Sequence, residues 1–277
     1  MYTAAIDIGT GFTKAVVLDP PDRIVGRGRL KTGVDLDAAA GRALAHAIAD
    51  AGLSASDIAY TATTGFGRYG FAARDIQITE ITSAAAGAHL LFPQSNIVLD
   101  IGNQATRAIA LTPNGKVKAF KTNDKCAAGS GSFIGRAAKY LQVSIEDVGD
   151  LALNAQNPQP ISSVCAVLAE SEIINLVSAG TSIEDILRGI YDSLAERAAT
   201  LLRRAGLGIE LTFIGGVARQ RGMVKALESR LGIAVHVPED CDLVCAIGAA
   251  LLGSRRILNT QSRVTAVTAG EQLRTYS

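Results

Sequence analysis

Two cysteines of this chain stand where a thiol could do chemistry. Cys126 lies in NDKCAAGSGSFIG and Cys165 lies in SSVCAVLAESE. Each follows a polar loop and precedes a helical pattern, and a thiol near a helix N-terminus favours the thiolate, the form that ligates iron. Two thiolates leave a four-cysteine cluster incomplete, whereas a symmetric dimer could supply two from each partner. The spacing alone equally allows both cysteines to be ordinary core residues.

Two carboxylates form a second set of candidates. Asp7-Ile8-Gly9 precedes Lys14, and Asp100-Ile101-Gly102 precedes Arg107 at the same offset. We interpret the match as an internal repeat, with two lobes of one α/β unit facing each other across a cleft. Asp7 and Asp100 are placed to hold the hydration shell of Mg²⁺, which usually keeps several waters. Lys14 or Gln104 could neutralise phosphate charge or orient an attacking water.

Three glycine turns follow apolar strands and predict a phosphate site. Glycine allows backbone N–H groups to approach an anion closely, and nests of such groups bind phosphate. One turn alone is weak evidence, but the paired Asp-Ile-Gly turns and a late strand-Gly-Gly-helix make a stronger set. The residues expected to bind the nucleotide are Gly9, Thr10, Gly11, Gly102, Asn103, Gly215, Gly216, Val217 and Ala218.

The elements that must position these residues alternate between strands and helices. Apolar and helical periodicity predicts strand-turn-strand units after residues 1 and 95, long helices over 166–178 and 181–205, and a helix over 221–231. We expect a first lobe over 1–94, completed by a helix over about 243–257, and a second lobe over 95–242. The residues 259–277 are expected to form a polar tail.

The repeated turns and the late Gly-Gly turn together resemble motifs of the acetate and sugar kinase/heat-shock protein/actin superfamily. The resemblance covers nearly the whole chain. It implies an α/β fold of two ribonuclease-H-like lobes with an ATP cleft between them.

The cysteine stretches NDKCAAGSG and ISSVCAVLAESEIINLVSAG are more specific. They resemble the ATPase family that activates 2-hydroxyacyl-CoA dehydratases and drives ATP-dependent benzoyl-CoA reductase. The resemblance implies ATP/ADP, Mg²⁺ and a [4Fe–4S] cluster shared across a dimer interface, with Cys126 and Cys165 as ligands. It also implies a homologous ATPase subunit and a CoA-thioester reductase or dehydratase as partners.

One position departs from the homodimeric dehydratase activators. They tend to read Gly-Gly-Gln-Asp at the second phosphate turn, whereas this chain reads Gly102-Asn103-Gln104-Ala105, which puts the role of the fourth position in doubt. AAKYLQVSIEDVG and DILRGI are closer to the smaller ATPase subunit of benzoyl-CoA reductase. The expected function is therefore an ATP-hydrolysing electron-transfer subunit for ring reduction. A homodimeric dehydratase activator, a small-molecule kinase and a chaperone or scaffold are alternatives.

The composition and net charge indicate which kinds of partner are not expected. The chain has 277 residues, 48% hydrophobic and 19% charged, with a net charge of +1. We therefore expect an ordered protein with neither nucleic acid nor a membrane as partner. No apolar run reaches the roughly 20 residues of a membrane span, and MYTAAIDIG lacks the pattern of a signal peptide, so a cytoplasmic location is expected.

The other cysteines and the histidines are expected to have structural rather than catalytic or metal-binding roles. Cys241 and Cys245 have apolar neighbours and are expected to be buried, and the three histidines show no metal spacing. Glu170 and Glu172 are expected to cap, to pair with a cation or to face a partner. The segment TGFGRYG, with Phe66 and Tyr69, is a candidate for lining the cleft or an interface.

Overall fold

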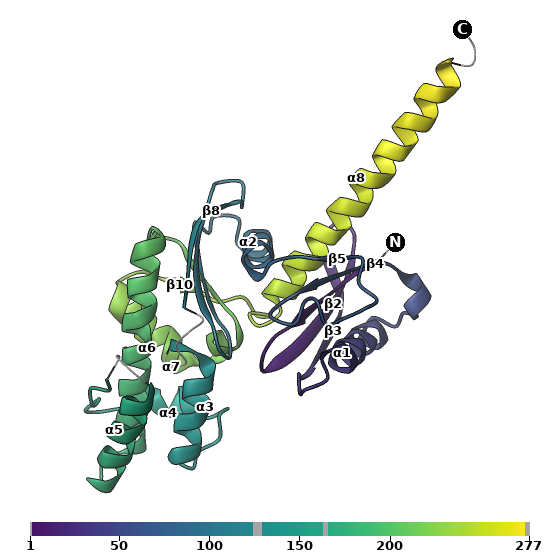
Figure 1. The fold of residues 1–277 in the computed structure, drawn as a ribbon. Coiled ribbons are helices and arrows are strands. Elements are labelled where there is room, and N and C mark those ends of the chain that lie inside the picture. Colours follow the sequence, from purple (N-terminus) through teal and green to yellow (C-terminus); the bar gives the residue numbers. More distant parts are fainter. Residues whose placement is uncertain (1, 124–128, 163–165, 275–277) are drawn as a thin grey trace. The chain divides into compact units, whose positions relative to one another are not determined.

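The structure, a computed structural model, describes residues 2–123, 129–162 and 166–274 (Figure 1). The chain divides into two compact units. Unit 1 comprises Met1–Gly87 and Cys245–Ser277, and unit 2 comprises Ala88–Val244.

Unit 1 is built on a five-stranded sheet of order β3-β2-β1-β4-β5. The first three strands are antiparallel, and β4 and β5 continue parallel to β1. Because β1 is covered on both faces, its residues from 3 to 8 are all buried, which explains the continuous rather than alternating run of small and apolar residues. The strands are β1 Tyr2–Ile8, β2 Phe12–Asp19, β3 Arg23–Lys31, β4 Ile58–Thr64 and β5 Ile76–Gln77.

Helices pack on this sheet through small residues. Helix α1 begins after Asp35, whose side chain accepts from the amide of Ala38, and four alanines of α1 are buried. The helical elements are α1 Leu36–Asp50, η1 Ala55–Asp57, α2 Glu80–Leu91, which crosses the division between the units, and α8 Val244–Arg274. The expected helix over 243–257 is thus longer than predicted, and residues 259–274 are helical in backbone. Their sequence has no proline and one glycine, so nothing in it ends the helix.

Unit 2 repeats the same sheet topology. Its order, β8-β7-β6-β9-β10, has the same sequence of three antiparallel strands followed by two parallel ones. The internal repeat expected from Asp-Ile-Gly is therefore present in the fold. The strands are β6 Ile97–Ile101, β7 Thr106–Leu111, β8 Val117–Asn123, β9 Leu211–Ile214 and β10 Val235–His236.

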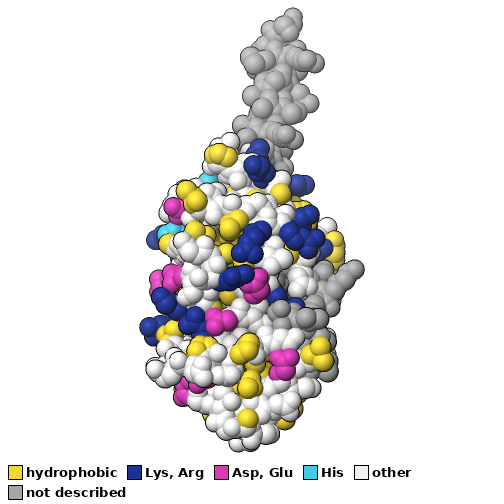
Figure 2. Space-filling model, turned by 90° about the vertical axis from the view of Figure 1, so that its left-hand side faces the viewer, with side chains coloured by type: hydrophobic (Ala, Val, Ile, Leu, Met, Phe, Trp, Pro, Cys, Tyr) yellow, Lys and Arg dark blue, Asp and Glu magenta, His cyan; other side chains and the backbone are white. Residues whose placement is uncertain are grey.

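The helices of unit 2 enclose its core. The 23-residue α6 begins at the cap Ser182 and ends at Gly206 in the left-handed conformation, and it packs against α7, β7 and β8. Phe133, Tyr191 and Phe213 are fully buried in the core of this unit. The helical elements are α3 Gly131–Tyr140, α4 Val148–Leu151, η3 Ala152–Asn154, α5 Ala166–Ser178, α6 Ile183–Ala205, η4 Gly216–Arg219 and α7 Arg221–Leu231. Figure 2 shows basic and acidic side chains intermixed on one face, in keeping with the small net charge.

Candidate functional site

The first candidate pair, Asp7 and Lys14, is formed by neighbouring strands of unit 1. The two residues are directly opposed in the register of β1 and β2. Lys14 Nζ lies 2.6 Å from Asp7 Oδ2, and the side chains are only 13% and 9% exposed. A carboxylate held in this way at the end of a central strand can hold the water shell of a divalent cation, because its position is fixed by the sheet.

The second pair repeats this arrangement in unit 2. Asp100 and Arg107 are opposed in β6 and β7, and Arg107 Nη1 lies 2.8 Å from Asp100 Oδ2. The basic residue expected from the matching offset is therefore bound to the carboxylate in both units.

The turns between the paired strands are closed by the predicted glycines. The amide of Gly9 donates to the carbonyl of Phe12 at 3.2 Å, and that of Gly102 donates to Ala105 at 2.9 Å. The tips of the two turns are consequently Thr10-Gly11 and Asn103-Gln104. Asn103 and Gln104 are exposed, as their predicted roles require.

Gly215, from the third predicted turn, lies directly against the carboxylate of Asp100. Its φ is +90°, and a Cβ at this position would lie 2.6 Å from Asp100 Oδ1 and 2.5 Å from the carbonyl oxygen of Ile101. The next residues form η4, in which Val217 and Ala218 are 5% and 3% exposed. These two predicted binding residues therefore support the turn through the core.

Unit 1 has a counterpart of Gly215 that the sequence reasoning missed. Gly65 also has φ +90°, and a Cβ there would lie 2.5 Å from Asp7 Oδ1 and 2.6 Å from the carbonyl oxygen of Ile8. The signal was available, because IAYTATT is followed by Gly-x-Gly just as LTFI is followed by Gly-Gly. Each unit thus places an aspartate between a cation and a bare glycine.

A further pair that was not predicted follows the turn of unit 2. Arg219 Nη2 lies 2.6 Å from Asp242 Oδ1, whose side chain is 2% exposed. The hydrogen bond from Arg219 to Asp242 raises the pKa of the guanidinium. Because a guanidinium is planar and stacks on flat rings, this anchored Arg219 is suited to hold a base.

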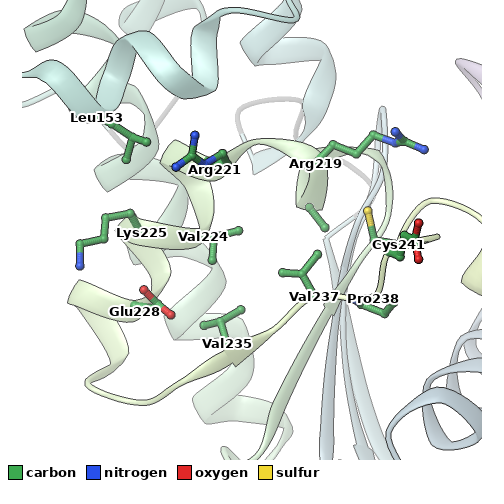
Figure 3. A pocket seen from close by; sticks show the side chains of 12 residues that line it. Leu153, Arg219, Arg221, Val224, Lys225, Glu228, Val235, Val237, Pro238 and Cys241 are labelled. Atoms are coloured by element: carbon green, nitrogen blue, oxygen red, sulfur yellow. The ribbon is translucent and has the colours of Figure 1, made fainter.

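Arg219 borders an open groove of about 610 Å³ within unit 2 (Figure 3). Val224 on α7 and Val235 and Val237 near β10 line its apolar part, while Arg221, Lys225 and Glu228 contribute charge. An apolar groove with a few polar groups, next to the Gly215-Gly216 turn, has the features of a site for a small organic molecule.

The predicted metal ligands Cys126 and Cys165 lie outside the described residues. Helices α3 and α5 begin shortly after them, as the helical patterns predicted. Among the residues that the structure does describe, no group of three or more histidine, cysteine and acidic side chains could hold a metal ion. Cys241 and Cys245 are buried, as expected, and burial raises the pKa of the Cys241 thiol to about 11. Within the described part of the chain, none of the helices has the length and apolar character needed to cross a membrane.

Proteins with similar sequences are named as activators of CoA-thioester dehydratases or as a subunit of a CoA-thioester reductase. A 2-hydroxyisocaproyl-CoA dehydratase activator of Clostridioides difficile is 36% identical over 95% of this chain and 99% of the relative. An activator of lactoyl-CoA dehydratase of Anaerotignum propionicum is 39% identical over 91% of this chain and 96% of the relative. One of the subunits of the benzoyl-CoA reductase of Thauera aromatica is 39% identical over 92% of this chain and 93% of the relative.

Solved structures with a similar fold include a relative of the same kind and a more distant kinase. The Clostridium difficile activator with bound ADPNP matches with a TM-score of 0.90 at 35% identity, covering 95% of this chain and 98% of its own. A ROK family glucokinase from Streptomyces griseus matches with a TM-score of 0.58 at 14% identity, covering 92% of this chain and 100% of its own, which shows the fold alone. The two-lobe fold of the kinase, heat-shock protein and actin superfamily is thereby confirmed. Residues 5–253 match the BadF/BadG/BcrA/BcrD ATPase family, and the chain belongs to that family.

Proposed function

We propose that this chain is an ATP-hydrolysing iron–sulfur electron-transfer subunit that drives low-potential electrons into a benzoyl-CoA-reductase-type partner. The observation that carries the proposal is the repeated unit of aspartate, cation and glycine turn in a chain 39% identical to a benzoyl-CoA reductase subunit.

The described residues fit a nucleotide. Only glycine fits at 65 and 215, because a Cβ there would clash with the carboxylates of Asp7 and Asp100, so both turns can approach the ends of the central strands closely. The carboxylates would hold Mg²⁺ through its waters. The turn tips 10–11 and 103–104 would donate amides to phosphate, with Gln104 placing the attacking water.

The base would be held in unit 2. Arg219 has its guanidinium fixed by Asp242, next to the groove of Figure 3. If the base of a nucleotide stacked on this guanidinium, the phosphates of the nucleotide would extend toward the Gly215-Gly216 turn. The ADPNP in the Clostridium difficile activator supports a nucleotide as the ligand.

Cys126 and Cys165 would hold the iron–sulfur cluster, with the second pair of thiolates coming from an identical or homologous subunit. The cluster, when bound, supplies a one-electron carrier whose potential depends on its exposure and hydrogen bonds. Helix α5 supports a protein partner near Cys165, because three of its large apolar side chains are about half exposed: Leu168, Ile174 and Val177.

A second candidate is a homodimeric activator of a 2-hydroxyacyl-CoA dehydratase. It is favoured by the names of the Clostridioides difficile and Anaerotignum propionicum relatives, whose identities of 36% and 39% are close to the 39% of the reductase subunit. The two candidates share the nucleotide and cluster sites and differ in the partner.

Anaerobic purification from the native host, with iron analysis and identification of bound subunits, tests the proposal. A cluster shared by two chains gives about two irons per chain. Cys126→Ser should lose the iron, whereas the control Cys245→Ser, at a buried described thiol, should keep it. Co-purification with a homologous ATPase subunit supports the reductase role, and a homodimer supports the activator. A colourless protein that phosphorylates a metabolite would contradict both.

A further inference from the structure

Helix α3 is hydrogen bonded to the candidate nucleotide turn of unit 2. The amide of Gly131 donates to the carbonyl of Gly102 at 2.9 Å, and the amide of Ser132 donates to that of Asn103 at 2.8 Å. These two donors are at the first turn of α3, where helix amides lack partners within the helix. The helix is therefore fixed to the backbone of the Gly102-Asn103 turn.

The same end of α3 also contacts the second turn. A Cβ at Gly131 would lie 3.1 Å from Val217 Cγ2, so this glycine lets η4 approach the helix closely. Both turns expected to surround a phosphate thus meet the first residue of α3.

The other end of α3 is joined to α5 by a three-residue bridge. Arg136 Nε lies 2.5 Å from Glu170 Oε1, and the hydroxyl of Tyr140 donates to Glu170 Oε2 at 3.1 Å. Arg136 and Tyr140 are four residues apart and therefore lie on one face of α3. Glu170 is 19% exposed and uses both oxygens in this bridge.

Both helices are anchored well enough to transmit a displacement. The neighbouring face of α3, with Phe133, Ile134 and Ala137, is 1% exposed or less, and on α5 Ala169 and Ile173 are fully buried. Because a closely packed interior is hardly compressible, each of these helices is expected to move as a rigid unit. On α5, Glu172 also accepts from the amide of Ser162 at 2.5 Å, which ties the helix to the chain before Cys165.

We propose that α3 is the link through which the nucleotide turn positions α5, and that Glu170 is the positioning residue that joins the two helices. The inference rests on the proposed nucleotide function and adds to it the residues that carry the coupling. A change at Gly102-Asn103 shifts the first turn of α3, and the bridge of Arg136, Tyr140 and Glu170 transfers this shift to α5. The helix that follows Cys165, with its exposed apolar face, then responds to the state of the nucleotide.

Hydrogen exchange of the anaerobically purified full chain, with and without ADPNP and Mg²⁺, tests this link. In the unmodified chain, ADPNP should slow exchange at 102–105 and 215–217, and should change it in both α3 and α5 by roughly tenfold, a typical size for coupling between sites. Glu170→Gln and Arg136→Gln should keep the response of α3 and lose that of α5. The double variant should lose no more than either single one.

Matched variants separate positioning from general stability. Arg188→Gln, at a separate ion pair on α6, should leave the α5 response intact. Tyr140→Phe removes one hydroxyl and should weaken the response in part, which keeps the test open if Glu170→Gln does not fold. An α5 response that is unchanged in the Glu170 or Arg136 variants, or is missing from the unmodified chain while the turns respond, overturns the link. Lack of any response at the turns overturns the nucleotide function instead.

Discussion

Lys14 Nζ lies 2.6 Å from Oδ2 of Asp7, its direct neighbour across β1 and β2. The cation therefore does not point at a ligand by itself. It fixes the carboxylate and offsets its charge, while the other oxygen, Oδ1, packs so closely on Gly65 that a Cβ there would lie only 2.5 Å away. In unit 2, Arg107 pairs with Asp100 as Lys14 pairs with Asp7, so in both units a largely buried carboxylate is neutralised by a cation on the next strand.

Removing either carboxylate should weaken both the fold and the binding of nucleotide. Asp7→Asn and Asp100→Asn each leave a largely buried cation without its carboxylate, which should cost roughly 1–3 kcal/mol of unfolding free energy. The stabilisation by ADPNP and Mg²⁺ should be lost as well. Urea unfolding with and without the ligand measures both effects. Asp19→Asn, at an exposed pair with Arg23, is the control and should change stability by less than about 1 kcal/mol.

Gly215→Ala should destabilise unit 2, because the left-handed φ of +90° and the 2.6 Å approach to Asp100 Oδ1 both oppose a Cβ. We expect a loss of about 1–3 kcal/mol from the backbone conformation alone. Gly216→Ala is the matched control: its Cβ would meet nothing within 4 Å, so stability should be kept. Thermal unfolding of the two variants gives the comparison, and equal melting temperatures would contradict the assigned role of Gly215.

Replacing Arg219 should affect the nucleotide base rather than the phosphates. Arg219→Lys keeps a positive charge near Asp242 but loses the flat guanidinium. We expect the affinity for ADPNP to fall roughly tenfold, the size of one good stacking contact. The affinity for inorganic triphosphate should not change. Calorimetric titration measures both, and Arg230→Lys, at an ion pair outside the residues that line the groove, serves as control. A drop for both ligands would place Arg219 at the phosphates.

The stability of the protein should decline in alkali, in part because of Cys241. Burial raises the pKa of its thiol to about 11, above the ordinary value of 9.0. The folded state then keeps the proton that the unfolded chain releases, so the contribution is intact below about pH 9 and is lost as the pH rises toward 11. Denaturation curves from about pH 8 to 11 should show this fall, and Cys241→Ala should make it shallower. An identical slope in the variant would contradict the assignment.

The same pKa predicts the reactivity of the described thiols. Native Cys241 should resist alkylation by iodoacetamide at about pH 8, because the thiolate is the reactive form and the residue is 2% exposed. Peptide mapping after labelling of native and urea-unfolded protein checks this. Labelling of Cys241 in the native protein at the rate found in urea would show that the site opens.

Local patterns in the sequence were sufficient for the repeat and for its carboxylates. Asp-Ile-Gly with a basic residue at a fixed offset predicts two strand-turn-strand units, and the tight turns between antiparallel strands then place Asp7 opposite Lys14 and Asp100 opposite Arg107. The Gly215-Gly216 turn and the helices after Cys126 and Cys165 could also be predicted, since each depends on residues that are close in sequence.

Tertiary structure alone decided which distant residues complete the site. Gly65 lies beside Asp7 because β4 pairs parallel to β1, and Asp242 reaches Arg219 because the chain returns past η4 after β10. Glu170 meets Arg136 and Tyr140 because α3 and α5 pack together, although 30 or more positions separate them. Such contacts depend on how buried surfaces fit between elements, and periodicity along one segment does not encode them.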